Sequence, residues 1–145
     1  MSNPNNFISH LEEEEVIEAI KTSEKNTSGE IRVHIESRCT KDILERAKEV
    51  FYELKMDQTK LKNGVLIYLA IDDHKFYIMG DQGINDVVAD DFWQSTKDVM
   101  QAHFRKGNFK QGLVDGILKA GDQLKYHFPW ASDDVNELSD EISRG

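Results

Sequence analysis

The sequence predicts an α/β fold in which a small mixed β-sheet is sandwiched between α-helices. Glu30–Glu36 alternates apolar and polar residues, the period of a strand with one apolar face. Gly64–Ile71 is apolar on both faces and is predicted to be a central strand that is covered on both sides. A helical pattern separates the two strands, so a right-handed crossover should make them parallel.

A capping box begins the first predicted helix. Ser9 and Glu12 have the spacing at which each side chain can accept a hydrogen bond from the other residue's exposed amide. The apolar stripe that follows comprises Leu11, Val16, Ile17 and Ile20. This helix is expected to end near Asn26–Gly29, where turn-forming residues gather.

Thr40 is the predicted N-cap of the helix that joins the two strands. The apolar face of that helix comprises Ile43, Leu44, Ala47, Val50, Phe51 and Leu54. After the central strand, Asp72–Lys75 predicts a tight turn and Phe76–Met79 predicts a returning strand. The hairpin therefore adds an antiparallel strand to the parallel pair.

Two further helices are predicted in the last third of the chain. Asp90 is the expected N-cap of the first, and its stripe comprises Phe92, Trp93, Val99, Met100 and Phe104. Lys106–Asn108 interrupts the pattern before the second helix begins. Gly112 and Gly116 lie one turn apart in that second helix and predict close packing against a neighbour, because glycine in a helix otherwise costs about 1 kcal/mol.

The pattern divides the chain into a core domain and two flanks. Residues 1–8 are expected to be a flexible N-terminus and residues 9–127 a single domain. Residues 128–145 are expected to form a helical extension packed on or near that domain, with a helix that starts at Ser132–Asp134. The apolar face of this last helix comprises Val135, Leu138 and Ile142.

Composition narrows the classes of partner. The 145 residues include 27 acids and 18 bases, and the net charge of -9 argues against nucleic acid and anionic membranes. The single cysteine excludes an intrachain disulfide and a cysteine-rich zinc site. No signal peptide or membrane-spanning run is apparent, so we expect a cytoplasmic monomer.

The turn Gly80–Gly83 predicts a divalent-cation site, because it holds a carboxylate on a sharp turn beside other acids. Strand directions place the start of both parallel strands and the end of the hairpin strand at one edge of the sheet. The expected oxygen donors there are Glu30, Asp81, Asp86, Asp90 and Asp91. The structural alternative is that Asp81 and Asp90 only cap a turn and a helix, and that Glu30 pairs with Arg32.

Asp72 and Asp73 form a second, weaker candidate at the opposite edge of the sheet. Adjacent aspartates in a hairpin are also ordinary turn formers, since aspartate bonds its own backbone. His34 lies on the polar side of the first strand, where a structural role and a role as ligand or proton carrier both remain open.

Several ordered segments of this chain resemble the TPM domain family. They are Ser28-Gly29-Glu30-Ile31, Asn63-Gly64-Val65-Leu66-Ile67, Ile71-Asp72-Asp73-His74-Lys75, the turn ending at Gly83, Asp90, and Phe104-Arg105-Lys106-Gly107-Asn108-Phe109. The resemblance runs from about Phe7 to Lys125. It departs from the family at Asp81 and Asn85, where many members have glycine and glutamate.

The resemblance implies a mixed sheet between helices, and divalent cations on acidic residues. Members similar to this chain include thylakoid-lumen proteins linked to photosystem II repair and reported as acid phosphatases, and membrane-anchored bacterial proteins. We therefore expect a domain that binds calcium or magnesium. A weak metal-dependent acid phosphatase and a non-catalytic protein-interaction or repair module are the alternatives, and no catalytic residue can be assigned.

Overall fold

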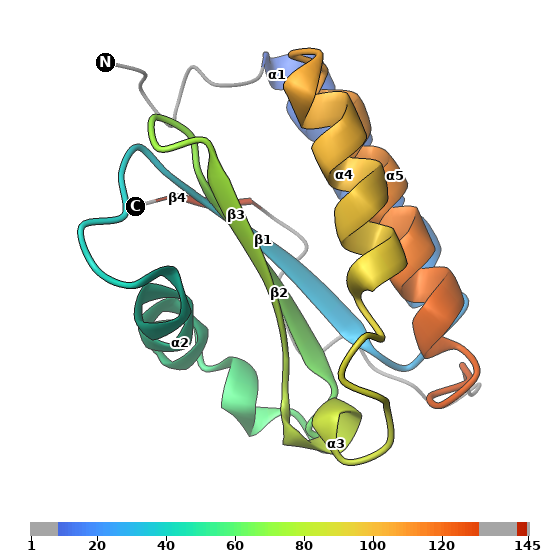
Figure 1. The fold of residues 1–145 in the computed structure, drawn as a ribbon. Coiled ribbons are helices and arrows are strands. Elements are labelled where there is room, and N and C mark those ends of the chain that lie inside the picture. Colours follow the sequence, from blue (N-terminus) through green and yellow to red (C-terminus); the bar gives the residue numbers. More distant parts are fainter. Residues whose placement is uncertain (1–8, 131–141, 145) are drawn as a thin grey trace.

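The computed structural model describes residues 9–130 and 142–144. Predictions for residues 1–8 and for the helix beginning at Ser132 lie outside the described residues, apart from Ile142. The elements are α1 (His10–Glu24), β1 (Glu30–Glu36), α2 (Ile43–Glu53), the 3-10 helix η2 (Met56–Gln58), β2 (Gly64–Ala70), β3 (Lys75–Gly80), α3 (Gln82–Asn85), α4 (Gln94–Arg105), α5 (Phe109–Leu124) and β4 (Ser143–Arg144). Figure 1 shows three layers, with α1, α4 and α5 on one side of the sheet and α2 on the other.

The sheet has the strand order β3-β2-β1-β4. β1 and β2 are parallel, and β2 and β3 are antiparallel, which confirms the predicted mixed sheet. β4 was not predicted; it extends the sheet parallel to β1, with Ser143 beside His34. Two paired residues leave no periodic signal in the sequence, so only the folded chain reveals this strand.

The caps of the helices agree with the sequence in one case and differ in two. Ser9 and Glu12 form the predicted capping box. The predictions for Thr40 and Asp90 are wrong: Asp42 caps α2, and α4 begins at Gln94 without a side-chain cap. The chain instead makes consecutive turns over residues 89–94, which keep Asp90 outside the helix.

Apolar side chains fill both sides of the sheet. One cluster lies between the sheet and the layer of α1, α4 and α5, and a second, smaller cluster lies under α2. Close packing at Gly112 and Gly116 is confirmed, since a methyl group at either position would meet Phe104 or Met100 of α4 at 2.5 Å. No helix among the described residues has the length and apolarity needed to cross a bilayer.

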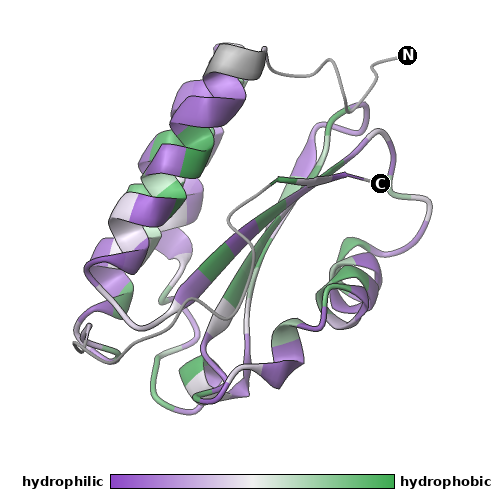
Figure 2. Ribbon diagram, turned by 180° about the vertical axis from the view of Figure 1, so that it is seen from behind, coloured by the Kyte–Doolittle hydropathy of each residue, from purple (hydrophilic) through white to green (hydrophobic). Residues whose placement is uncertain are grey.

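Figure 2 shows hydrophobic and hydrophilic residues alternating along β1. Ile31, Val33 and Ile35 face the larger apolar cluster, as their spacing predicts. The opposite row of β1 is polar but largely buried: Glu30, His34 and Glu36 are only 4–6% exposed. The second face of β1 is therefore part of the protein interior.

Candidate functional site

One edge of the sheet collects the ends of three strands. Glu30 pairs with Gly64 at the start of β1 and β2, and Val65 pairs with Gly80 at the end of β3. The amide of Asp81 donates to the carbonyl of Gly64 at 2.9 Å. The strand directions expected from the sequence therefore hold at this edge.

At the same edge, the loop that precedes β2 crosses the start of α3. The amide of Gly83 donates to the carbonyl of Lys62 at 2.8 Å. A methyl group at Gly83 would lie 2.6 Å from that oxygen and closer still to the carbonyl oxygen of Leu61, so only glycine permits this approach. Lys62 itself adopts the left-handed conformation, with φ of 52°, which a residue with a side chain rarely does. We call this place the loop crossing: residues 61–63 against residues 81–86.

Asp81 begins the second segment of the loop crossing, directly after β3. Its carboxylate is the N-cap of α3, where it accepts the Gln82 amide through Oδ1 at 2.7 Å. Its second oxygen, Oδ2, is buried and has no hydrogen-bond partner among the described residues. A buried oxygen of this kind is uncommon, because burial without a partner costs free energy.

The other predicted donors are dispersed around Asp81. Asp86 ends α3 and accepts from the side-chain amide of Gln82 at 2.6 Å. Asp90 and Asp91 are exposed in the turns before α4, and Glu30 is buried in the polar row of β1. Among the described residues, no group of three or more histidine, cysteine, aspartate or glutamate side chains is arranged to hold a metal ion.

Asp72 and Asp73 lie in the β2–β3 turn, at the far edge of the sheet. The amide of Asp72 donates to the carbonyl of Ser37 at 2.8 Å, and Asp73 Oδ2 accepts the Cys39 amide at 2.6 Å. These bonds join the turn to the segment that follows β1. The Asp73 carboxylate therefore has a structural role at this turn.

Sequence reasoning missed a buried polar network centred on Glu36. Arg46 of α2 donates from Nε to Oε1 and Oε2 of Glu36 at 3.1 and 3.0 Å, and from a second nitrogen to Oε1. The hydroxyl of Tyr68 on β2 bonds the same carboxylate. His34 bridges Glu36, at 3.1 Å from Nε2, and Ser143 of β4, at 3.0 Å from Nδ1.

The only hint of this network in the sequence is Tyr68 within a strand that is otherwise wholly apolar. A buried tyrosine hydroxyl requires a hydrogen-bond partner, and the parallel neighbour of β2 is the polar row of β1. Which partner it finds depends on the register of β1 against β2 and on the position of α2.

Burial and hydrogen bonding have opposite effects on the pKa values of Glu36 and His34 in this network. Burial alone would raise the pKa of Glu36, but hydrogen bonds from Arg46, Tyr68 and His34 outweigh it and hold that pKa at about 2. Burial raises the pKa of Tyr68, and its bond to Glu36 acts in the same direction. Burial lowers the pKa of His34 from 6.5, against the opposing effect of its hydrogen bond with Glu36.

These shifts predict acid destabilisation that begins with His34. Its folded-state pKa lies below its unfolded value, so the unfolded chain binds this proton more readily and stability falls as the pH drops below 6.5. Protonation of Glu36 lowers the stability of the folded state further as the pH falls from 4.5 towards about 2. Urea unfolding between pH 7.5 and 5 is expected to show a smaller pH dependence in His34→Gln than in the wild type.

His127→Gln is the control for that measurement, because His127 is exposed. It should keep the pH dependence of the wild type. Equal pH dependence in the wild type and His34→Gln would contradict the assignment to His34.

Comparison with known proteins places this architecture among related domains. A family model described as the TPM domain matches residues 1–123. A search of curated proteins finds no match. The chain is 56% identical to the BA42 protein from the psychrophilic bacterium Bizionia argentinensis, known from an NMR structure, with full coverage of both chains and a TM-score of 0.94.

Two more distant solution structures share the fold alone. The N-terminal domain of a protein from P. gingivalis is 21% identical, with 84% of this chain and 79% of that chain covered and a TM-score of 0.70. The N-terminal domain of the cg2496 protein from Corynebacterium glutamicum is 12% identical, with 88% and 80% covered and a TM-score of 0.66.

Proposed function

Since this chain belongs to the TPM domain family, we propose that it is a divalent-cation-binding domain whose site lies at the loop crossing. The observation that carries the proposal is the buried, unpartnered Oδ2 of Asp81. A calcium or magnesium ion beside this oxygen would compensate the cost of its burial.

The loop crossing holds several oxygen atoms, and the ammonium of Lys62, which belongs to it, donates to the carbonyl of Asp57. The carbonyl groups of Leu61 and Lys62 converge on Gly83, and Asp86 ends the same short helix. Calcium accepts carboxylate, carbonyl and water oxygens together, so it does not require a cluster of carboxylates. Among the described residues, no lysine or arginine forms an ion pair with Asp81 or Asp86, or with the exposed pair Asp90 and Asp91.

Titration of the chelator-treated protein with calcium and with magnesium, followed by amide NMR shifts, tests the proposal. We expect localised shifts at residues 61–63 and 81–86. Asp81→Asn keeps the shape of the cap but removes the charge, and it should weaken binding by about tenfold or more, which is at least about 1.4 kcal/mol. Glu18→Gln, which neutralises an exposed acid on α1, should leave the affinity unchanged.

Two results would overturn this assignment. The first is the absence of localised shifts up to about 10 mM cation, which lies above the range of the weakest extracellular calcium modules. The second is a loss of affinity in Asp73→Asn but not in Asp81→Asn, which would move the site to the β2–β3 turn.

Hydrolysis of phosphomonoesters and recognition of a protein partner are the two elaborations that the family resemblance adds. A bound cation would neutralise a phosphate and activate water. Turnover of a chromogenic phosphoester that requires calcium or magnesium and is lost in Asp81→Asn would support the first. Partner capture that depends on the cation and is lost on chelation would support the second.

A further inference from the structure

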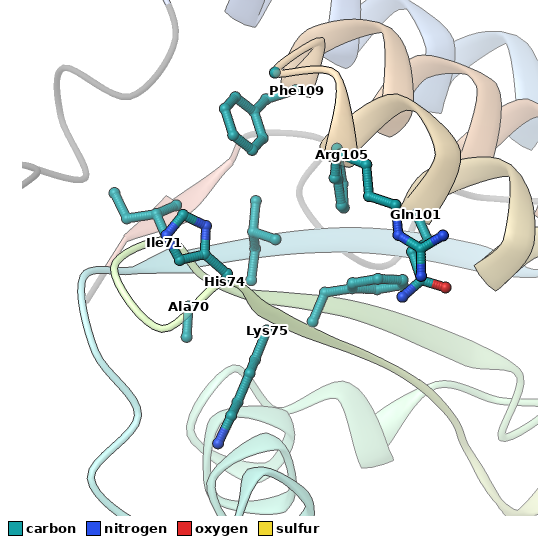
Figure 3. A pocket seen from close by; sticks show the side chains of 11 residues that line it. Ala70, Ile71, His74, Lys75, Gln101, Arg105 and Phe109 are labelled. Atoms are coloured by element: carbon teal, nitrogen blue, oxygen red, sulfur yellow. The ribbon is translucent and has the colours of Figure 1, made fainter.

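A cavity of about 480 Å³ opens at the edge of the sheet opposite the loop crossing. It lies between the β2–β3 turn and the junction of α4 and α5 (Figure 3). Its volume is within the range of about 300–1,000 Å³ that is typical of small-molecule sites. The loop crossing and the Glu36 network contribute none of its lining residues, so it is a separate feature of the molecule.

Hydrogen-bond donors line two sides of this cavity. Figure 3 shows His74 on the hairpin side and Gln101 and Arg105 together on the helix side. Lys75 also contributes to the lining, but its side chain points away from Arg105 and Phe109.

The donors of the cavity are uncommitted. The side chains of His74, Gln101 and Arg105 form no hydrogen bond or ion pair with another described residue. Although the chain carries a net charge of -9, no aspartate or glutamate is among the described residues that line the cavity. The lining of the cavity therefore includes basic side chains and no carboxylate, in a protein that is acidic as a whole.

The remaining wall is apolar and largely aromatic. Phe104 contacts Phe76 edge to face, with ring centroids 5.3 Å apart, and lies 5.7 Å from the ring of Phe109. Leu69 and Ile71 complete this wall from β2 and the turn that follows it. Such a surface gains free energy when an apolar body covers it.

The backbone at His74 is held in an unfavourable conformation. Its φ is 53°, in the left-handed region where glycine is favoured. Glycine would fit this turn with less strain, yet the chain places there a side chain that reaches the cavity. Strain of this kind is often found where a side chain serves a ligand site.

From this geometry we propose that the cavity binds a small organic anion: a carboxylate or phosphate attached to a flat apolar body. The Arg105 guanidinium matches the two oxygens of such an anion, and Gln101 and His74 supply further N–H donors. The apolar body lies against Phe76, Phe104 and Phe109. Binding here is independent of any cation at the loop crossing.

Amide NMR titration with 1-naphthoate, 1-naphthyl phosphate, 1-naphthalenemethanol and inorganic phosphate tests the proposal, in the presence of chelator. Either naphthyl anion is expected to shift amides of residues 70–76 and 101–109, and the preferred one identifies the anionic group. The neutral alcohol lacks the anionic group, and inorganic phosphate lacks the apolar body. Each should therefore bind at least about tenfold more weakly than the preferred naphthyl anion.

Three variants sharpen the test. Arg105→Gln should weaken binding of the preferred anion by about tenfold or more, whereas Lys106→Gln removes the adjacent charge, which does not line the cavity, and should have little effect. His74→Gly should weaken binding while raising the midpoint of thermal unfolding, because it relieves the left-handed strain. This pairing of weaker binding with higher stability separates a loss of contact from a loss of fold.

Three outcomes would overturn the proposal. They are an absence of localised shifts at about 10 mM naphthyl anion, which would mean a dissociation constant above the millimolar range, equal affinities for the anion and the neutral alcohol, and equal effects of Arg105→Gln and Lys106→Gln.

Discussion

Replacing Glu36 by alanine is expected to lower the free energy of unfolding by about 3–5 kcal/mol. The carboxylate is only 6% exposed and accepts hydrogen bonds from Arg46, Tyr68 and His34. Its removal leaves the buried Tyr68 hydroxyl without its acceptor, and that hydroxyl then bears the cost of desolvation. The partly buried Arg46 guanidinium loses its buried partner and keeps only the more exposed Glu49 and Glu53. Urea unfolding of the wild type and the variant at pH 7 measures the difference.

Glu53→Ala is the matched control for that variant. Glu53 pairs with the same Arg46, at 3.5 Å, but its side chain is 60% exposed. Solvent screens this ion pair, so its loss should cost less than about 1 kcal/mol. If the two variants were equally destabilised, the loss of stability would come from removing any ion-pair partner of Arg46, and the buried network would have no special role.

Gly83→Ala is expected to be the second most damaging change, with a loss of about 3 kcal/mol. The new methyl group would approach two backbone carbonyl oxygens, of Leu61 and Lys62, so the loop itself would have to move. If cations bind at the loop crossing, the same variant should also bind calcium more weakly, because the carbonyl groups would be displaced. Urea unfolding and the calcium titration measure the two effects.

Gly116→Ala provides the comparison. A methyl group there would also come within 2.5 Å of another atom, but that atom belongs to the flexible side chain of Met100. Methionine can change rotamer, and alanine is a better helix former than glycine by about 1 kcal/mol, so we expect a smaller loss. If Gly116→Ala lost more stability than Gly83→Ala, the backbone at the loop crossing would be able to shift at little cost in free energy.

The parts of the fold that depend on local patterns could be predicted from the sequence. β1 occupies Glu30–Glu36 as its alternation predicts, and the capping box at Ser9 forms. The N-cap prediction at Thr40 failed because Asp42, two residues on, caps α2 instead. The prediction at Asp90 failed because consecutive turns delay the start of α4 to Gln94, where no side chain caps the helix. The short strand β4 has no local signal at all.

The predicted site residues illustrate the same limit. Strand direction alone placed Glu30 and Asp81 at one edge of the sheet, as the register shows. It did not indicate that Asp81 would be partly buried at a crossing of two loops, since that depends on the contact of Gly83 with residues 61 and 62. Nor did it indicate that Asp73 would bind the backbone of Cys39.

By itself the sequence determined the order and direction of three strands, the helices that cover them and the membership of a family, because periodicity and strand connection are properties of neighbouring residues. Only the tertiary structure decided which polar groups are buried together. Glu36, Arg46 and Tyr68 come from three elements, and the cavity joins the β2–β3 turn to the end of α4. Contacts between segments so far apart in the chain depend on how the layers pack, and no local pattern records them.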